Sequence, residues 1–323
     1  MLATTINKYC YLTCRYLPPF FEHRIRVVYG QIENCRTLDE INHPAVREIL
    51  KYLKIDRGVE IHHDGDLPAR SGLGSSSAFT VGLLHALYAL KGHMPNKQQL
   101  AKESICIEQE RLKEIVGSQD QVLAAHGGFN HIIFRTDGEI IVRPITLPLE
   151  RIRELNSQLM LFFTGISRTA SNIAESYVNG VEAREGEMRT ISQMVDEGIA
   201  ILNKGRDMGE FGKLLHESWQ VKRQLSSKVT NSRIEEIYNE ALMTGALGGK
   251  LIGAGGGGFM LLFVRPTDQN RVKERLRKLI CVPFQFEFSG SQVIFFDPEE
   301  DYSAEERDRA NRPISGFKEH PDS

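Results

Sequence analysis

Apolar and polar residues alternate at the start of the chain. Over residues 3–17 the side chains alternate in the manner of a half-buried β-strand, and residues 26–32 continue in the same manner. Between residues 43 and 55 the apolar spacing becomes three and four, so Val46 and Ile49 share one face of a helix. We therefore expect sheet first and a helix after it.

Three more helices can be predicted from the residues that follow. A β-like run at 59–63 leads through a Gly/Ser stretch into an apolar helix. A long helix is predicted over 96–115, because Asn96 is a good N-cap and Gly117 a good stop. Ser118 to Gln121 then fits a capping box, in which the Gln121 side chain would reach back to the Ser118 backbone and start a new helix.

Later segments complete an α+β pattern. We expect a hairpin from 129–134 and 139–145, a strand over 159–163, and helical structure through about 167–244. A final group of elements is predicted at the following residues: strand 259–264, helix 268–279, and strands 283–288 and 292–296. Antiparallel strands covered by helices define an α+β fold.

The change to helical composition near residue 158 predicts two domains. We place an N-terminal, β-rich α/β domain at 1–157 and a C-terminal α+β domain at 158–297. Residues 298–323 are rich in charge and poor in apolar side chains, so we expect a disordered tail or a loose helix there.

Composition excludes several classes of protein. The 323 residues include 40 basic and 42 acidic side chains, a net charge of -2, so no global field favours nucleic acid or an anionic membrane. The longest strongly apolar run, 259–264, has the length of a strand and not of a membrane span. Five scattered cysteines without a CxxC pair suit reduced thiols. We expect a cytoplasmic protein whose anion sites are local.

The stretch Pro68 to Ala78 is a candidate anion-binding loop. It lies between a strand and a helix, where glycines allow a tight turn and the first N–H groups of the helix are free. The loop lacks the lysine of a Walker A sequence. A Gly/Ser turn that only caps a core helix is the alternative. The residues that would cradle the anion are Gly72, Leu73, Gly74, Ser75, Ser76 and Ser77.

Glu108 and Asp120 are the candidate reactive carboxylates. The break between their two helices turns the chain back, which could bring both to one cleft. Asp120 lies near the start of its helix, where the dipole favours an ionised carboxylate that can accept a proton from a hydroxyl. A solvated helix residue is the alternative reading of Glu108.

Three other features can contact a ligand. Gly253 to Gly258 fits G-x-G-x-x-G, but a strand follows it where a dinucleotide site needs a helix, so we interpret it as a flat segment that lets a backbone or phosphate approach. Arg168 offers a two-pronged donor for phosphate after the strand end at Thr164, with a surface arginine as the alternative. Trp219 and Lys222, three residues apart on one helix face, could bind a sugar plane and an anion, with core packing of Trp219 and a snorkelling lysine as the alternative.

Taken together, three motifs resemble those of the GHMP kinases. They are Gly-Leu-Gly-Ser-Ser-Ser ending at Ser77, Gly-Ser-Gln-Asp-Gln ending at Gln121 with Glu108 before it, and the glycine run ending at Gly258. Further segments resemble the D-glycero-D-manno-heptose 7-phosphate kinase branch: Thr5-Ile-Asn-Lys-Tyr9, Gly127-Gly-Phe-Asn130, Phe163-Thr-Gly-Ile-Ser-Arg168 and Trp219-Gln-Val-Lys222.

The resemblance implies roles for the candidate residues. The fold would be a two-domain GHMP kinase fold with ATP between the domains and a ferredoxin-like second domain. The loop from Gly72 to Ser77 would hold the ATP phosphates, Ser76 and Glu108 would bind Mg²⁺, and Asp120 would face the acceptor hydroxyl. Arg168, with Lys222 as a second choice, would bind the phosphate of a sugar phosphate, and Gly255 and Gly256 would line the substrate site.

The implied activity is phosphorylation of the anomeric hydroxyl of heptose 7-phosphate. Another sugar 1-kinase, such as a fucokinase-like enzyme, and a non-catalytic sugar or nucleotide sensor are the alternatives. The family also has a glycine-rich first motif ahead of the position of Ala3, which helps to form the sugar site. We therefore expect this polypeptide to lack one wall of the acceptor site and to have weak or no heptose kinase activity by itself.

Overall fold

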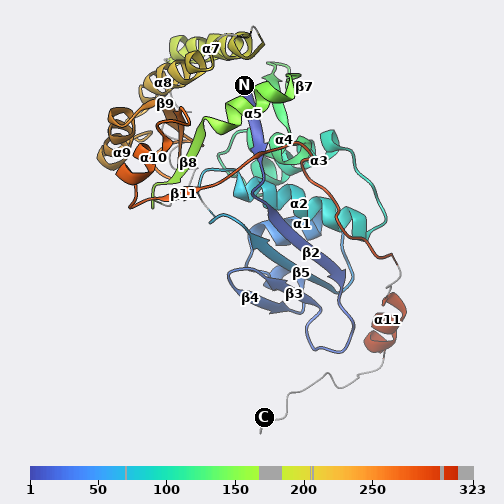
Figure 1. Ribbon diagram of the computed structural model, residues 1–323. Helices are drawn as coiled ribbons and strands as arrows, with labels where there is room; N and C mark the ends of the chain where they lie inside the picture. Colours follow the sequence, from blue (N-terminus) through green and yellow to red (C-terminus); the bar gives the residue numbers. More distant parts are fainter. Residues whose placement is uncertain (70, 167–183, 204, 206, 299–301, 312–323) are drawn as a thin grey trace.

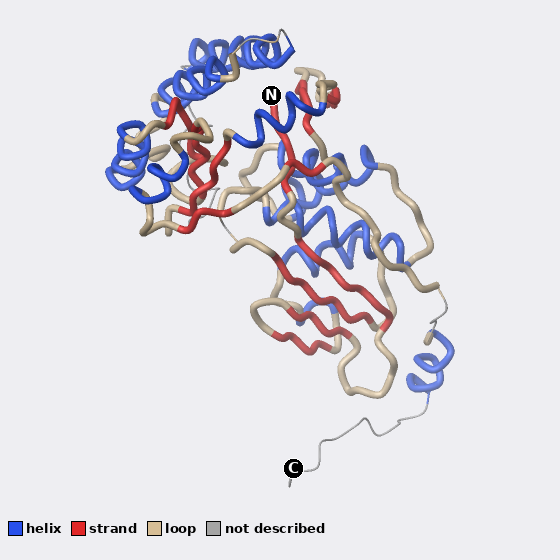
Figure 2. Tube along the Cα trace, viewed as in Figure 1, coloured by secondary structure: helices blue, strands red, loops and turns tan. Residues whose placement is uncertain are grey.

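The computed structural model describes residues 1–323 except 70, 167–183, 204, 206, 299–301 and 312–323. Within the described residues, the strands form three four-stranded sheets. Their orders are β2-β5-β3-β4, β12-β1-β6-β7 and β11-β8-β10-β9. Figures 1 and 2 show the first sheet at one end of the molecule, the third at the other, and the second between them.

The first sheet and its helices form the core of the N-terminal half. The strands are β2 (Cys10–Tyr16), β3 (Ile25–Val28), β4 (Ile32–Cys35) and β5 (Val59–Gly65). The helices are α1 (Pro44–Tyr52), α2 (Ser75–Leu90), α3 (Lys97–Cys106) and α4 (Gln119–His126). Ile61 of β5 and Leu83 and Leu84 of α2 are fully buried together in this core. Burial of such side chains is the main stabilising term.

The second sheet joins the beginning of the chain to its end. Strand β1 (Leu2–Ile6) pairs on one side with β6 (Phe129–Phe134), which forms a hairpin with β7 (Ile140–Pro144). On its other side β1 pairs with β12 (Phe286–Glu287), with Thr5 opposite Glu287. In Figure 1 the chain after β11 crosses back to the N-terminal half to make this contact.

The third sheet forms the C-terminal half. Its strands are β8 (Leu159–Phe163), β9 (Ala246–Leu251), β10 (Phe259–Val264) and β11 (Ile280–Val282), all paired antiparallel. The helices are α5 (Leu149–Ser157), α7 (Glu185–Asn203), α8 (Gly209–Arg223), α9 (Ser232–Met243) and α10 (Gln269–Arg275). Trp219, Tyr238 and Leu262 belong to one buried cluster of this half. The two halves confirm the predicted α+β architecture.

Several predicted boundaries were wrong. Residues 26–32 are two strands of a hairpin, β3 and β4, and not one strand. The helix predicted over 96–115 ends as α3 at Cys106 and continues only through a π-helical turn, Ile107–Arg111. The strand predicted over 292–296 pairs with no described strand, and Ile294 and Phe295 are 83% and 82% exposed. An alternating pattern does not reveal whether a neighbouring strand is present to pair with, and this segment has none among the described residues.

The predicted capping box is also wrong. Ser118 is the N-cap of α4 but its side chain accepts no cap hydrogen bond, and Gln121 does not reach back to it. Gln121 is fully buried and its amide donates to Glu108 instead. The Gln121 side chain therefore makes a hydrogen bond in the interior and does not cap α4.

The described part of the charged tail is helical. Helix α11 (Ser303–Asn311) contacts the loops that precede β5 and β3, where Glu306 Oε1 accepts a 2.6 Å hydrogen bond from the Gly58 N–H. Arg24 Nη2 donates to Glu306 Oε2 at 3.2 Å. Of the two expected alternatives, residues 303–311 thus adopt the helix.

Among the described residues, no helix combines the length and the apolar content that crossing a bilayer requires.

Candidate active site

The first glycine segment forms the turn between β5 and α2. Gly72 and Gly74 have φ of 83° and 71°, left-handed values that a side chain resists, and α2 begins directly after them at Ser75. The first backbone N–H groups of a helix have no acceptor within that helix. They carry the positive end of the helix dipole, so this turn has the geometry that the predicted anion cradle requires, and anion binding there stays a prediction.

The second glycine segment, residues 253–258, packs directly on the first. A Cβ on Gly253 would lie 2.6 Å from the carbonyl oxygen of Gly72, and one on Gly258 would overlap the carbonyl oxygen of Ser71. Backbone therefore meets backbone here, which only glycine allows. Since the two segments come from opposite halves of the chain, this contact brings the C-terminal half to the anion cradle.

Asp120 lies beside the anion cradle. A Cβ on Gly74 would be 3.1 Å from both Cβ and Cγ of Asp120, so the carboxylate touches the turn that precedes α2. Partial burial raises the pKa of Asp120, and a hydrogen bond from Gln119 opposes the shift. The sequence predicted only that Asp120 and Glu108 lie at one cleft, and this contact places Asp120 at the turn before α2.

Glu108 is buried beneath the same helix start. Its side chain belongs to the π-helical turn after α3 and is 1% exposed. Ser77 Oγ donates to Glu108 Oε2 at 3.0 Å, and Gln121 Nε2 donates to the same oxygen at 2.6 Å. Burial raises the pKa of Glu108, and the bonds from Ser77 and Gln121 partly oppose that rise. Glu108 is thus an interior group, and the solvated alternative is excluded.

The serine that donates a hydrogen bond to Glu108 is Ser77, whereas the resemblance names Ser76 as the second magnesium ligand. Successive residues of a helix point about 100° apart, so only one serine of the first turn can face the interior. Ser77 is buried against Glu108, whereas Ser76 is exposed at the outer surface of that turn. The role of Ser76 in binding a metal stays a prediction.

The donor set fits a magnesium ion held mainly by its substrate. Glu108 Oε1 is buried and has no hydrogen-bond partner in the described part of the chain, so one hard oxygen ligand is left for a cation. The described residues contain no group of three or more His, Cys, Asp or Glu that could hold a metal. Mg²⁺ commonly binds one or two carboxylates together with phosphate oxygens and water, which suits this single carboxylate.

Lys222 and the glycines at 255 and 256 hold the second glycine segment in place. Lys222 Nζ donates to the carbonyl oxygens of Leu251 and Gly253 at 3.1 and 2.5 Å. The Gly256 N–H donates to Val229 O at 2.7 Å, and Gly255 packs against Val229. Their predicted contacts with substrate remain predictions, but the structure gives each of them a role in shaping the segment.

Trp219 and Arg168 are the two remaining candidates. Trp219 is fully buried and lies 6.2 Å from the Tyr238 ring, centroid to centroid, so it belongs to the core. Arg168 lies outside the described residues. The chain just before it is anchored at the site, because Ile166 O accepts a 2.8 Å hydrogen bond from the Gly258 N–H.

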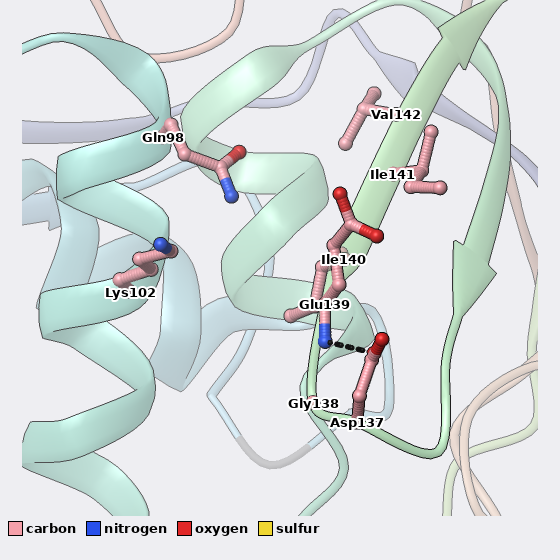
Figure 3. A pocket seen from close by; sticks show the side chains of 8 residues that line it. All are labelled: Gln98, Lys102, Asp137, Gly138, Glu139, Ile140, Ile141 and Val142. Carbon is pink, nitrogen blue, oxygen red and sulfur yellow. Dashed lines mark hydrogen bonds between the residues drawn. The ribbon is translucent and has the colours of Figure 1, made fainter.

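A separate hollow lies on the N-terminal half. Figure 3 shows Gln98 and Lys102 of α3 on one side and the hairpin residues Asp137 to Val142 on the other. None of the residues lining it belongs to a glycine segment or carries the carboxylate of Glu108 or Asp120. It is therefore separate from the candidate active site.

Two family models match this chain. The model described as "GHMP kinases N terminal domain" matches residues 41–128, and "GHMP kinases C terminal" matches residues 199–280. The first range contains the first glycine segment, Glu108 and Asp120, and the second contains the second glycine segment.

Individual relatives agree with the family models. A D-glycero-alpha-D-manno-heptose 7-phosphate kinase of Campylobacter jejuni is 33% identical over 234 residues, which cover 72% of this chain and 69% of that protein. An L-fucokinase/L-fucose-1-P guanylyltransferase of Bacteroides fragilis is 27% identical over 248 residues, 74% of this chain but 25% of that protein.

Among solved structures, a D-glycero-D-manno-heptose 1-phosphate kinase from Bacteroides thetaiotaomicron superposes with a TM-score of 0.73 and 25% identity. The match covers 91% of this chain and 90% of that one.

Proposed function

This chain belongs to the GHMP kinase family, and on that premise we propose that it transfers the γ-phosphoryl group of ATP to the anomeric hydroxyl of D-glycero-D-manno-heptose 7-phosphate. The product would be the 1,7-bisphosphate. Membership of the family makes the protein an ATP-dependent phosphotransferase; the acceptor and the position of transfer are the proposal. The contact between the Asp120 carboxylate and Gly74 of the anion cradle supports phosphoryl transfer at this site, and the acceptor is carried by the 33% identity to a heptose 7-phosphate kinase.

The chain's own residues supply binding and positioning. The free N–H groups at the start of α2 bind the phosphates, and the second glycine segment closes over Gly72 and Ser71. Asp120 orients the acceptor hydroxyl. As the hydroxyl oxygen attacks the γ-phosphorus, the carboxylate either accepts the hydroxyl proton or stabilises the hydroxyl by electrostatic attraction. Because phosphoryl transfer has a loose transition state, positioning and charge neutralisation provide most of the rate.

Magnesium is the cofactor that fits Glu108. Bound there, it would neutralise charge on the phosphates. Glu108 Oε1 is the protein oxygen available for it, and Ser77 and Gln121 hold the other carboxylate oxygen. The neighbouring Ser76 hydroxyl, which is exposed on the first turn of α2, remains a candidate second ligand.

Glu108→Gln is expected to raise the Mg²⁺ concentration needed for half-maximal activity by roughly tenfold or more, because it removes the only buried charge proposed for the cation. The measurement is the rate of ADP release against Mg²⁺ concentration at fixed ATP. Glu110→Gln is the matched control, since Glu110 lies two residues away on the exposed surface. An unchanged Mg²⁺ requirement in Glu108→Gln would remove the metal assignment.

Arg168→Ala is expected to raise the KM for a 7-phosphosugar at least tenfold more than the KM for the same sugar without phosphate, because a guanidinium binds phosphate through two hydrogen bonds. Steady-state kinetics with the two sugars measure this ratio. The control is Arg189→Ala, an exposed arginine of α7 paired with Glu185. Equal effects on both sugars would refute a phosphate role for Arg168.

A panel of acceptors tests the proposed substrate. ADP release is followed with heptose 7-phosphate, the unphosphorylated heptose, fucose, galactose and mevalonate, at an enzyme concentration high enough to detect slow turnover. We expect the highest kcat/KM with heptose 7-phosphate. Preference for fucose would favour the alternative suggested by the 27% identical fucokinase relative. Binding of magnesium-ATP with no turnover of any acceptor would favour a sensor.

A further inference from the structure

Two buried acceptor oxygens at the candidate site have no hydrogen-bond partner within the described residues. They are Oε1 of Glu108 and Oε1 of Gln121. Gln121 is 0% exposed and Glu108 is 1% exposed. Buried polar atoms are normally satisfied, and an exception at such a site needs an explanation such as a bound ion or water.

The Gln121 amide holds the Glu108 carboxylate in one orientation. Its Nε2 donates to Glu108 Oε2 at 2.6 Å, and Ser77 Oγ donates to that same oxygen at 3.0 Å. Because a carboxylate is planar, two donors on Oε2 fix the direction in which Oε1 points. They also leave Oε1 available for a third partner. Because the amide donates through Nε2, its own Oε1 is also left as an acceptor.

Gln121 is also next to Asp120 in the first turn of α4. The side chain of Asp120 lies against Gly74 in the glycine turn, and that of Gln121 reaches the interior at Glu108. The first turn of α4 therefore positions both carboxylates: Asp120 belongs to this turn, and Glu108 is held by Gln121 of the same turn. The capping role expected for Gln121 would have placed its amide elsewhere.

We propose that Gln121 is a positioning residue for the phosphate-bound divalent cation. It orients Glu108 so that Oε1 faces the cation, and its own Oε1 accepts a hydrogen bond from a water molecule of the cation's hydration shell. The inference rests on the proposed function, since it assumes that Glu108 binds the cation. Residues that orient a metal ligand by hydrogen bonding typically contribute 10–100-fold to metal affinity.

The test measures cation affinity directly and does not depend on turnover. Mn²⁺ is titrated into the full chain saturated with a non-hydrolysable ATP analogue, and free Mn²⁺ is followed by electron paramagnetic resonance. We expect Gln121→Met, which removes both the donor and the acceptor at similar size, to raise the Mn²⁺ Kd about tenfold or more. Gln121→Asn, which keeps an amide on a shorter side chain, should restore part of the affinity.

A neighbouring amide provides the matched control. Gln109 adjoins Glu108 in sequence, and its Nε2 donates to Val116 O at 2.9 Å and to Ser118 Oγ at 3.2 Å without contacting Glu108. Gln109→Met should lower the melting temperature but leave the Mn²⁺ Kd within about twofold. If Gln109→Met and Gln121→Met weaken Mn²⁺ binding equally, the effect is structural and the inference is overturned.

Glu108→Gln separates failure of the inference from failure of the metal assignment. Weaker Mn²⁺ binding in Glu108→Gln with normal binding in Gln121→Met would overturn the role of Gln121 alone. Normal binding in both variants would overturn the metal assignment of Glu108 and, with it, the inference. Weaker binding in both, with partial recovery in Gln121→Asn, supports the proposal.

Discussion

Asp120→Asn lowers kcat by roughly two or more orders of magnitude and leaves ATP affinity nearly unchanged, if the carboxylate acts on the acceptor hydroxyl. The substitution keeps the size of the side chain, which matters because Asp120 is packed against Gly74. It removes the charge and the ability to accept a proton. Single-turnover kinetics measure the chemical step, and calorimetry with a non-hydrolysable ATP analogue measures nucleotide affinity.

Asp137→Asn is the control for this substitution, because Asp137 is an exposed carboxylate in the β6-β7 turn. It should keep normal turnover. If Asp120→Asn also turns over at the normal rate, Asp120 has no catalytic role. A loss of ATP affinity equal to the loss of kcat would instead show that the carboxylate shapes the nucleotide site.

Gly258→Ala is expected to separate the two glycine segments and to reduce kcat/KM for ATP at least a hundredfold. The added Cβ would overlap the carbonyl oxygen of Ser71, and Gly258 has a φ of 94°, which an alanine resists. The Gly258 backbone cannot move without disturbing its own hydrogen bonds, because its N–H donates to Ile166 O and its carbonyl oxygen accepts from the Thr164 N–H. Nucleotide affinity and the melting temperature should both fall.

Gly92→Ala is the control that separates the effect of backbone strain from the effect of the clash with Ser71. Gly92 has a φ of 72° but nothing lies within 4 Å of an added Cβ, and it is at the opposite end of α2. It should cost about 1–2 kcal/mol of stability with normal kinetics. Equal kinetic effects of Gly92→Ala and Gly258→Ala would show that contact between the glycine segments is not required for ATP use.

Local patterns in the sequence predicted the elements that build the site. The strand predicted at 59–63, which is β5, the helix after the glycine turn and the hairpin of β6 and β7 follow from periodicity and turn residues. The contact of Asp120 with Gly74 agrees with the expectation that the break before α4 returns the chain to the cleft. Family resemblance, and not the pattern itself, assigned chemistry to these residues.

The features that local patterns could not predict depend on contacts between distant residues. Whether Ser76 or Ser77 faces Glu108 is decided by the rotation of α2 on its core, which three consecutive serines cannot reveal. Gln121 was assigned to a local cap because the capping pattern is short-range, whereas its partner is 13 residues away. The pairing of β1 with β12 joins Thr5 to Glu287, and the unpaired run at 292–296 has a strand-like pattern without a sheet edge.

The position of the new phosphate on the sugar tests the central proposal most directly. The protein is incubated with magnesium-ATP and heptose 7-phosphate, and the isolated product is examined by ³¹P nuclear magnetic resonance. We expect the signal of the 7-phosphate to persist beside a second signal coupled to the anomeric proton. A second phosphate on any other carbon, or a product without a second phosphate while other acceptors are phosphorylated, would contradict a heptose 7-phosphate 1-kinase.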